Sequence, residues 1–181
     1  MSVAISILRG INVSGHRKIP MQELKALYSE LNLKNITTYI QSGNVVFSGG
    51  KINPEALAKK IEKKIFERYN FEVPVIVRTI VEIQSILNGN PFLKEKNIEM
   101  DKLHVTFLAD HPGKDNLEKL KSYNYEPDRF IVVGREIYLY CPGGYGNTKL
   151  SNNFFESKLK VTATTRNWRT VNELLRIAVA T

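Results

Sequence analysis

The chain has 181 residues, of which 43% are hydrophobic, which suffices for one ordinary domain or two small ones and excludes a disordered chain. The net charge is +8, from 26 Lys and Arg against 18 Asp and Glu, and this balance favours anionic partners such as nucleotides, phosphorylated metabolites or nucleic acid. The single cysteine, Cys141, excludes an internal disulfide and favours a cytoplasmic protein, and no apolar run approaches the roughly 18 residues of a membrane span.

The first half of the chain predicts strands and helices in the order β-α-β-β-α-β. An apolar run at 3–8, cut short by Arg9, indicates a strand rather than a signal peptide. A helix is expected from Pro20 to Leu31, because apolar residues recur there at spacings of three and four. The remaining elements are expected as strands at 36–40 and 45–48, a helix from Asn53, a strand at 73–78 and a short helix opened by a capping box of Thr79 and Glu82.

The second half repeats this order after a polar, irregular stretch. Strands are expected at 103–108, 129–133, 136–140 and 161–165, and helices at 114–121, at 151–159 and after a capping box of Thr170 and Glu173. A tight hairpin is predicted at Gly134-Arg135. The fold class is therefore α+β, with two ferredoxin-like halves packed together and mostly antiparallel sheets. The expected division is residues 1–90 for the N-terminal half, 91–101 for a linker, and 102–181 for the C-terminal half with an extra terminal helix.

Four polar segments stand at strand ends or helix starts and contain no Asp or Glu, namely residues 9–18, 39–44, 141–153 and 164–170. The carboxylates gather elsewhere, because 14 of the 18 lie between Glu55 and Glu136. Arginine side chains and main-chain N–H groups at helix starts suit phosphate or carboxylate oxygens. These segments could equally be ordinary polar loops whose glycines serve turn geometry, and their glycines match neither the phosphate-loop nor the dinucleotide-binding pattern.

Catalytic patterns are few. The three histidines are far apart in sequence, and one cysteine cannot supply the spacing of a structural metal site, so no metal and no cofactor are expected. Cys141 lies beside a glycine-rich stretch and is a candidate nucleophile. His16 and Tyr145 are the candidates for proton transfer. Trp168 could stack on a base, although a tryptophan at a helix start more often covers a core.

The segments LRGINVSGHRKIPM, TYIQSGNVVF, GYGNTKLSN and TATTRNWRTV together resemble a bacterial family of conserved, uncharacterised cytoplasmic proteins, domain-of-unknown-function family 1697. The likeness runs from about Val3 to Ala178. It implies two interlocked ferredoxin-like halves and assigns no catalytic role. The family usually has Ser where this chain has Thr148, so a hydroxyl is kept.

The function expected from these patterns is binding of a nucleotide or phosphorylated metabolite in a cleft lined by the four acid-free segments. Two alternatives are an enzyme acting on a phosphorylated small molecule and a nucleic-acid-binding protein that uses the lysine-rich helix after Asn53, with Lys59, Lys60, Lys63 and Lys64. No membrane partner is expected. The expected ligand-binding residues are Arg9, Asn12, Lys18, Gln41, Ser42, Asn44, Tyr145, Lys149, Arg166, Asn167 and Arg169.

Overall fold

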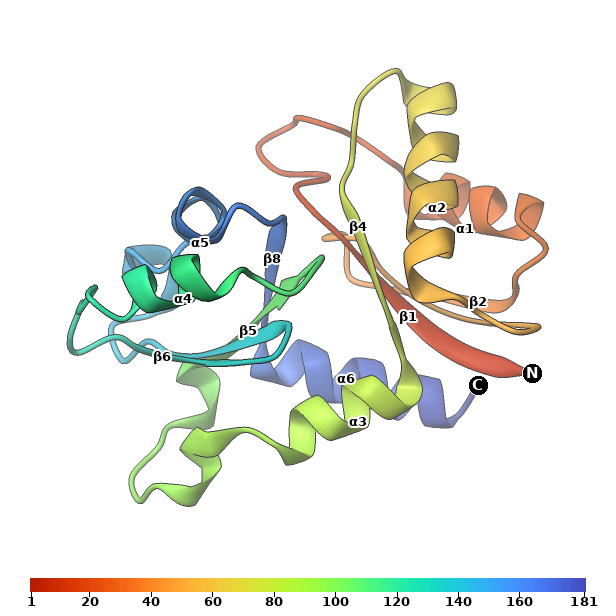
Figure 1. Cartoon of the computed structure of the whole chain (residues 1–181). Coiled ribbons are helices and arrows are strands. Elements are labelled where there is room, and N and C mark those ends of the chain that lie inside the picture. The colour runs from red at the N-terminus through yellow and green to blue at the C-terminus, as the bar shows by residue number, and fades with distance from the viewer. The chain divides into compact units, whose positions relative to one another are not determined.

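The computed structural model describes all of residues 1–181, which fold as two compact units (Figure 1). The first unit comprises residues 1–85 together with 173–181, and the second comprises residues 86–172. The division expected from the sequence differs from this one in two respects, the boundary between the units and the placement of the last residues. The boundary falls after Ser85, within a helix, and the last nine residues group with the first unit although they follow the second in the chain.

The first unit has the ferredoxin-like order of elements. In chain order they are β1 (Ser2–Leu8), α1 (Met21–Glu30), β2 (Lys34–Tyr39), β3 (Asn44–Gly49), α2 (Pro54–Tyr69), β4 (Val75–Thr79) and the start of α3 (Ile80–Asn88). The strands form an antiparallel sheet in the order β2-β3-β1-β4, with Ile5 opposite both Val46 and Arg78. The fold class expected from the sequence is therefore confirmed for this unit.

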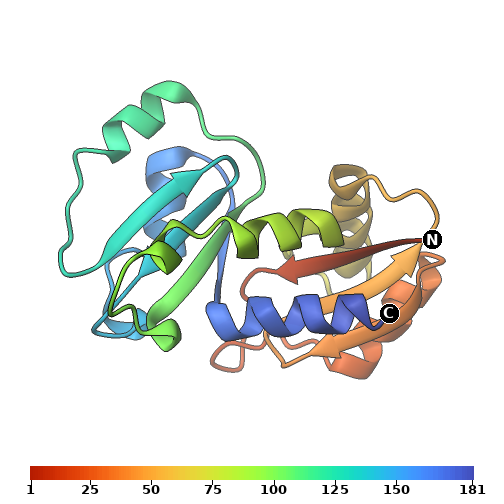
Figure 2. The same cartoon turned by 90° about the horizontal axis from the view of Figure 1, so that it is seen from below.

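The core of the first unit lies between one face of this sheet and helices α1 and α2. Ala4 and Leu8 from β1 pack there with Phe47 from β3 and with Leu24 and Ile61 from the helices, because alternate strand residues share one face. Ser6, a polar residue of β1 on that face, is satisfied by a hydrogen bond between its hydroxyl and that of Tyr28, 2.6 Å apart. The residues at the end of α6 belong to the same unit and lie along the strands (Figure 2).

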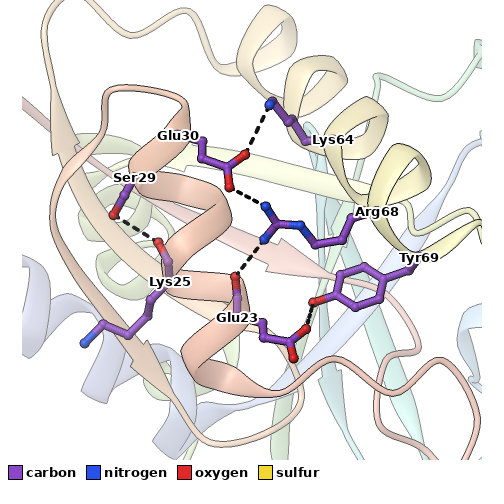
Figure 3. A network of polar contacts seen from close by, with 7 residues as sticks. All are labelled: Glu23, Lys25, Ser29, Glu30, Lys64, Arg68 and Tyr69. Atoms are coloured by element: carbon purple, nitrogen blue, oxygen red, sulfur yellow. Dashed lines mark hydrogen bonds and ion pairs between the residues drawn. The ribbon is translucent and has the colours of Figure 1, made fainter.

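A polar network joins α1 to α2 on the surface of the first unit (Figure 3). Glu30 of α1 accepts hydrogen bonds from Lys64 and Arg68 of α2. Glu23 accepts one from the hydroxyl of Tyr69 at 2.6 Å. Burial, followed by this hydrogen bond, raises the pKa of Tyr69 to about 12. Both carboxylates of α1 are therefore directed toward α2.

The second unit repeats the architecture. After the end of α3 its elements are η1 (Pro91–Lys94), η2 (Met100–Lys102), β5 (Leu103–Leu108), α4 (Lys114–Leu120), β6 (Arg129–Val133), β7 (Glu136–Tyr140), η3 (Tyr145–Asn147), α5 (Asn152–Leu159), β8 (Ala163–Asn167) and the start of α6 (Trp168–Val179). The antiparallel sheet has the order β6-β7-β5-β8, so β6 is an edge strand. The core between sheet and helices contains Leu108, Leu139, Phe155 and Leu159.

Local sequence signals set several element ends. Thr79 and Glu82 form the expected capping box, because the main-chain N–H of each residue donates to the side chain of the other. The expected hairpin is also confirmed, with Val133 opposite Glu136 across a two-residue turn. The last helix begins three residues earlier than expected, at Trp168, because Asn167 rather than Thr170 caps it: the Asn167 side chain accepts a hydrogen bond from the N–H of Thr170 at 2.8 Å. None of the helices combines the length and the apolarity that crossing a membrane requires.

Candidate functional site

The first two polar segments, residues 9–18 and 39–44, are held together in the first unit by the side chain of Asn12. Its amide nitrogen donates to the carbonyls of Ile19 at 3.1 Å and Gln41 at 2.9 Å, and its oxygen accepts from the N–H of Ile19 at 2.8 Å. The backbone of Asn12 has φ +56°, a conformation that asparagine tolerates better than most residues. Asn12 therefore closes its own loop and joins it to the turn before β3.

Gly43 brings the same two segments into contact from the other side. Its carbonyl accepts a hydrogen bond from the N–H of Leu8 at 2.9 Å. A Cβ atom built on Gly43 would lie 2.7 Å from the Cβ of Leu8 and 2.8 Å from Cδ1 of Ile11, and the backbone has φ +88°. Only glycine fits this close approach without a shift of its neighbours.

These contacts leave a hollow of about 350 Å³, here named the loop hollow, which is lined by Asn12, Gly15, Lys18, Ile19, Pro20, Met21 and Gln41. Lys18 is the only charged residue in this lining, and no carboxylate belongs to it. The hollow also borders the start of α1, where Pro20 takes the N-cap position and no side chain caps the helix. Uncapped N–H groups in a first helical turn carry a partial positive charge. The loop hollow is therefore electropositive, because Lys18 and the uncapped start of α1 both contribute positive charge.

The two cations next to the loop hollow, Arg17 and Lys18, do not pair with the acids of α1. Arg17 and Lys18 are exposed and form no salt bridge, whereas Glu23 and Glu30 are engaged with α2 (Figure 3). The guanidinium of Arg17 lies back over Gly10, 3.5 Å from where a Cβ would stand.

The other expected site residues of the first unit differ in burial, and only one of them, Gln41, lines the loop hollow. Arg9 is half-buried, with its N–H donating to the carbonyl of Pro74 at 3.0 Å. Gln41 lines the loop hollow, but Asn44 is fully buried. The amide of Asn44 donates to the carbonyl of Tyr39 and to the hydroxyl of Ser42, both at 3.0 Å. Asn44 and Ser42 therefore shape the turn that presents Gln41.

The third and fourth polar segments lie in the second unit, where Arg166 is tied to its own strand. Its guanidinium donates to the hydroxyl of Thr164 at 3.0 Å and to the carbonyl of Thr165 at 2.9 Å. Burial lowers its pKa to about 10, which leaves it charged at neutral pH. Asn167 caps α6, and Arg169 is exposed in the first turn of that helix.

The glycine-rich segment of the second unit carries aromatic contacts. The ring of Tyr145 stacks on that of His104, with centroids 4.8 Å apart, and burial lowers the pKa of His104. The ammonium of Lys149 lies over the ring of Tyr125, 5.5 Å from its centroid. Cys141 is fully buried, which raises the pKa of its thiol to about 11 and disfavours the thiolate that a nucleophile needs.

The lysine-rich face of α2 is partly neutralised. Lys59 pairs with Glu62 at 3.1 Å, and Lys63 with Glu67 at 3.9 Å. Lys64 reaches Glu30 on α1. This pattern is typical of a solvated helix face.

Sequence reasoning did not assign Ile19, Pro20 and Met21 to the site, although they line the loop hollow together with Lys18. One signal was available, because a proline at a helix start, with no Ser, Thr, Asp or Asn before it, leaves the first turn without a side-chain cap. This signal identifies an uncapped helix start. It does not identify the hollow, because the wall is completed by Gln41, which lies in a turn distant in the sequence.

Comparisons with known proteins agree with the expected resemblance. The conserved bacterial protein SP0830 from Streptococcus pneumoniae has a similar structure, with a TM-score of 0.76, 20% sequence identity and coverage of 98% of each chain, which shows a shared fold. A comparison with curated proteins finds no match. A family model described as "Protein of unknown function (DUF1697)" matches residues 1–138, which is more than half of the chain. The chain therefore belongs to the DUF1697 family of proteins of unknown function.

Proposed function

We propose that the first unit binds a small anionic ligand, a nucleotide or a phosphorylated metabolite, with a phosphate group in the loop hollow. The observation that carries this proposal is the lining itself, which has Lys18 as its only charge, no carboxylate, and the uncapped start of α1. A hollow of about 350 Å³ falls within the usual range for small-molecule sites, roughly 300–1,000 Å³.

Each part of the lining has a role in this proposal. Lys18 supplies a flexible ammonium that neutralises phosphate charge. The first-turn N–H groups of α1 donate hydrogen bonds to phosphate oxygens, assisted by the helix dipole. The Gln41 side chain orients the remainder of the ligand. Asn12 has a structural role, because its amide is hydrogen-bonded to the main chain on both sides of the hollow and so holds the two walls in place.

The proposal concerns the first unit alone. In the second unit Arg166 and Asn167 are engaged with their own strand and helix, and Lys149 lies over Tyr125. Neither side chain considered for proton transfer lines the loop hollow, because His16 is not part of its wall and Tyr145 stacks on His104. Binding is therefore favoured over catalysis.

Titration calorimetry with inorganic phosphate, pyrophosphate and a panel of nucleotides tests the proposal. Lys18→Met keeps most of the unbranched stem of the side chain and removes its charge. Lys51→Met is the matched control, since Lys51 is an exposed lysine of the same unit outside the lining. A charged hydrogen bond contributes roughly 1.5–3 kcal/mol, so the first variant should raise Kd by about ten- to a hundredfold. The proposal is overturned if no anion in the panel binds, or if both variants bind like the natural chain.

A further inference from the structure

A groove of about 730 Å³ in the second unit is lined by residues of α4 and of the edge strand β6. It is here named the edge groove. Aromatic side chains form much of its wall, namely Phe92, Tyr123, Tyr125 and Phe130. These rings are only partly covered, apart from the buried Phe92, so the groove offers apolar surface to an occupant.

The strand beside the edge groove has unused main-chain hydrogen-bonding groups. A two-residue hairpin makes the flanking pair, Val133 and Glu136, a hydrogen-bonded pair of the ladder. Because hydrogen-bonded and non-bonded pairs alternate, the N–H and C=O groups of Phe130 and Val132 point away from β7. No other strand lies on that side of β6. An extended chain could pair with β6 there.

The groove wall carries charges of both signs, with acids in a small majority. Both strongly basic residues of the wall are already paired: Lys121 with Glu118 at 2.7 Å, and Arg129 with Glu95, also at 2.7 Å. Two acidic residues of the wall, Glu126 and Asp128, form no ion pair. The lining therefore has three acids against two bases. The ammonium groups of Lys149 and Lys158 next to it are engaged with the rings of Tyr125 and Tyr123, which leaves Glu126 and Asp128 as the acids open to a basic partner.

We propose that the edge groove binds a basic, extended peptide segment of another protein, which adds a strand to β6. Its main chain pairs with the N–H and C=O groups of Phe130 and Val132. Alternate apolar or aromatic side chains enter the groove, and Lys or Arg side chains meet Glu126 and Asp128. A second copy of this chain is disfavoured as the occupant. Pairing β6 with itself about a two-fold axis would bring the same unpaired carboxylates together and would join two chains of charge +8.

Fluorescence anisotropy with a library of labelled, end-capped seven-residue peptides tests this proposal. The peptides alternate aromatic or aliphatic residues with Lys, with Ser or with Glu. Basic members should bind, and acidic members should bind at least about tenfold more weakly. The double variant Glu126→Gln with Asp128→Asn should weaken the basic peptides by about tenfold and leave the Ser peptides unchanged. Asp101→Asn, an exposed acid of the same unit outside the wall, is the matched control and should leave both unchanged.

Amide hydrogen exchange identifies the mode of binding. In the free chain the N–H groups of Phe130 and Val132 should exchange quickly, and saturating basic peptide should slow them more than their strand neighbour Ile131. The proposal is overturned if no peptide binds, if binding leaves those amides unprotected, or if sedimentation shows that the free chain dimerises through β6. Phosphate binding in the first unit is measured separately, so failure of either proposal leaves the other standing.

Discussion

Gly43→Ala is the substitution that most directly tests how the two polar segments of the first unit are joined. The new methyl group would stand 2.7 Å from the Cβ of Leu8 and 2.8 Å from Cδ1 of Ile11, inside ordinary contact distance. The backbone φ of +88° adds roughly 1–2 kcal/mol for a residue with a Cβ. Overpacking adds about 1–3 kcal/mol. The free energy of unfolding should therefore fall by about 2–5 kcal/mol.

Urea unfolding followed by circular dichroism measures this change. Gly50→Ala is the matched control in the same unit, because nothing lies within 4 Å of its Cβ position and its φ is not positive. The control should change the free energy of unfolding by less than about 0.5 kcal/mol. If Gly43→Ala were as mild as its control, the close approach of the turn to Leu8 and Ile11 would be refuted.

Three further predictions concern the site and its surroundings. Asn12→Asp should destabilise the chain by about 1–3 kcal/mol in urea unfolding, because a second carboxylate oxygen would face carbonyls where the amide now donates to Gln41; unchanged stability would contradict the bridging role of Asn12. The hydrogen bond from Arg68, helped by Lys64, holds the pKa of Glu30 below its ordinary 4.5, so Glu30 contributes stability above that pH and loses it as pH falls through the lowered pKa. Glu30→Gln should accordingly be less stable than the natural chain at pH 7, with a difference that shrinks as the pH falls through the lowered pKa, and a difference independent of pH would contradict this reading. Burial raises the pKa of Cys141 from 9 to about 11, so iodoacetamide at pH 8 should react about a hundredfold more slowly with the native chain than with the urea-unfolded chain, and equal rates would show that the thiol is accessible.

Most of the fold could be predicted because its signals are local. The β1 run, the capping box of Thr79 and Glu82, and the Gly134-Arg135 hairpin each depend on a few neighbouring residues. Their order along the chain was enough to indicate ferredoxin-like halves. The grouping of the last residues of α6 with the first unit depends on packing between segments far apart in the chain, which no short pattern encodes.

The sequence singled out the two polar segments that meet around the loop hollow, but it did not separate them from the two segments of the second unit, nor did it indicate the side-chain roles within them. Asn12 and Asn44 looked like ligand-orienting amides, yet both are occupied by main-chain or turn contacts. Residue type alone cannot distinguish an amide that faces a ligand from one that holds a loop. The edge groove was missed for a similar reason, because Tyr123, Tyr125 and Phe130 form a wall only once α4 stands beside β6.

The central claim, that the loop hollow accepts a phosphate group, is tested most directly by titrating the ¹⁵N-labelled chain with pyrophosphate and following its amide resonances. The account predicts saturable shifts concentrated at Gly15, Lys18, Ile19, Met21 and Gln41, which Lys18→Met weakens and Lys51→Met preserves. Shifts scattered over the lysines of α2, or no saturable shifts at all, would contradict it.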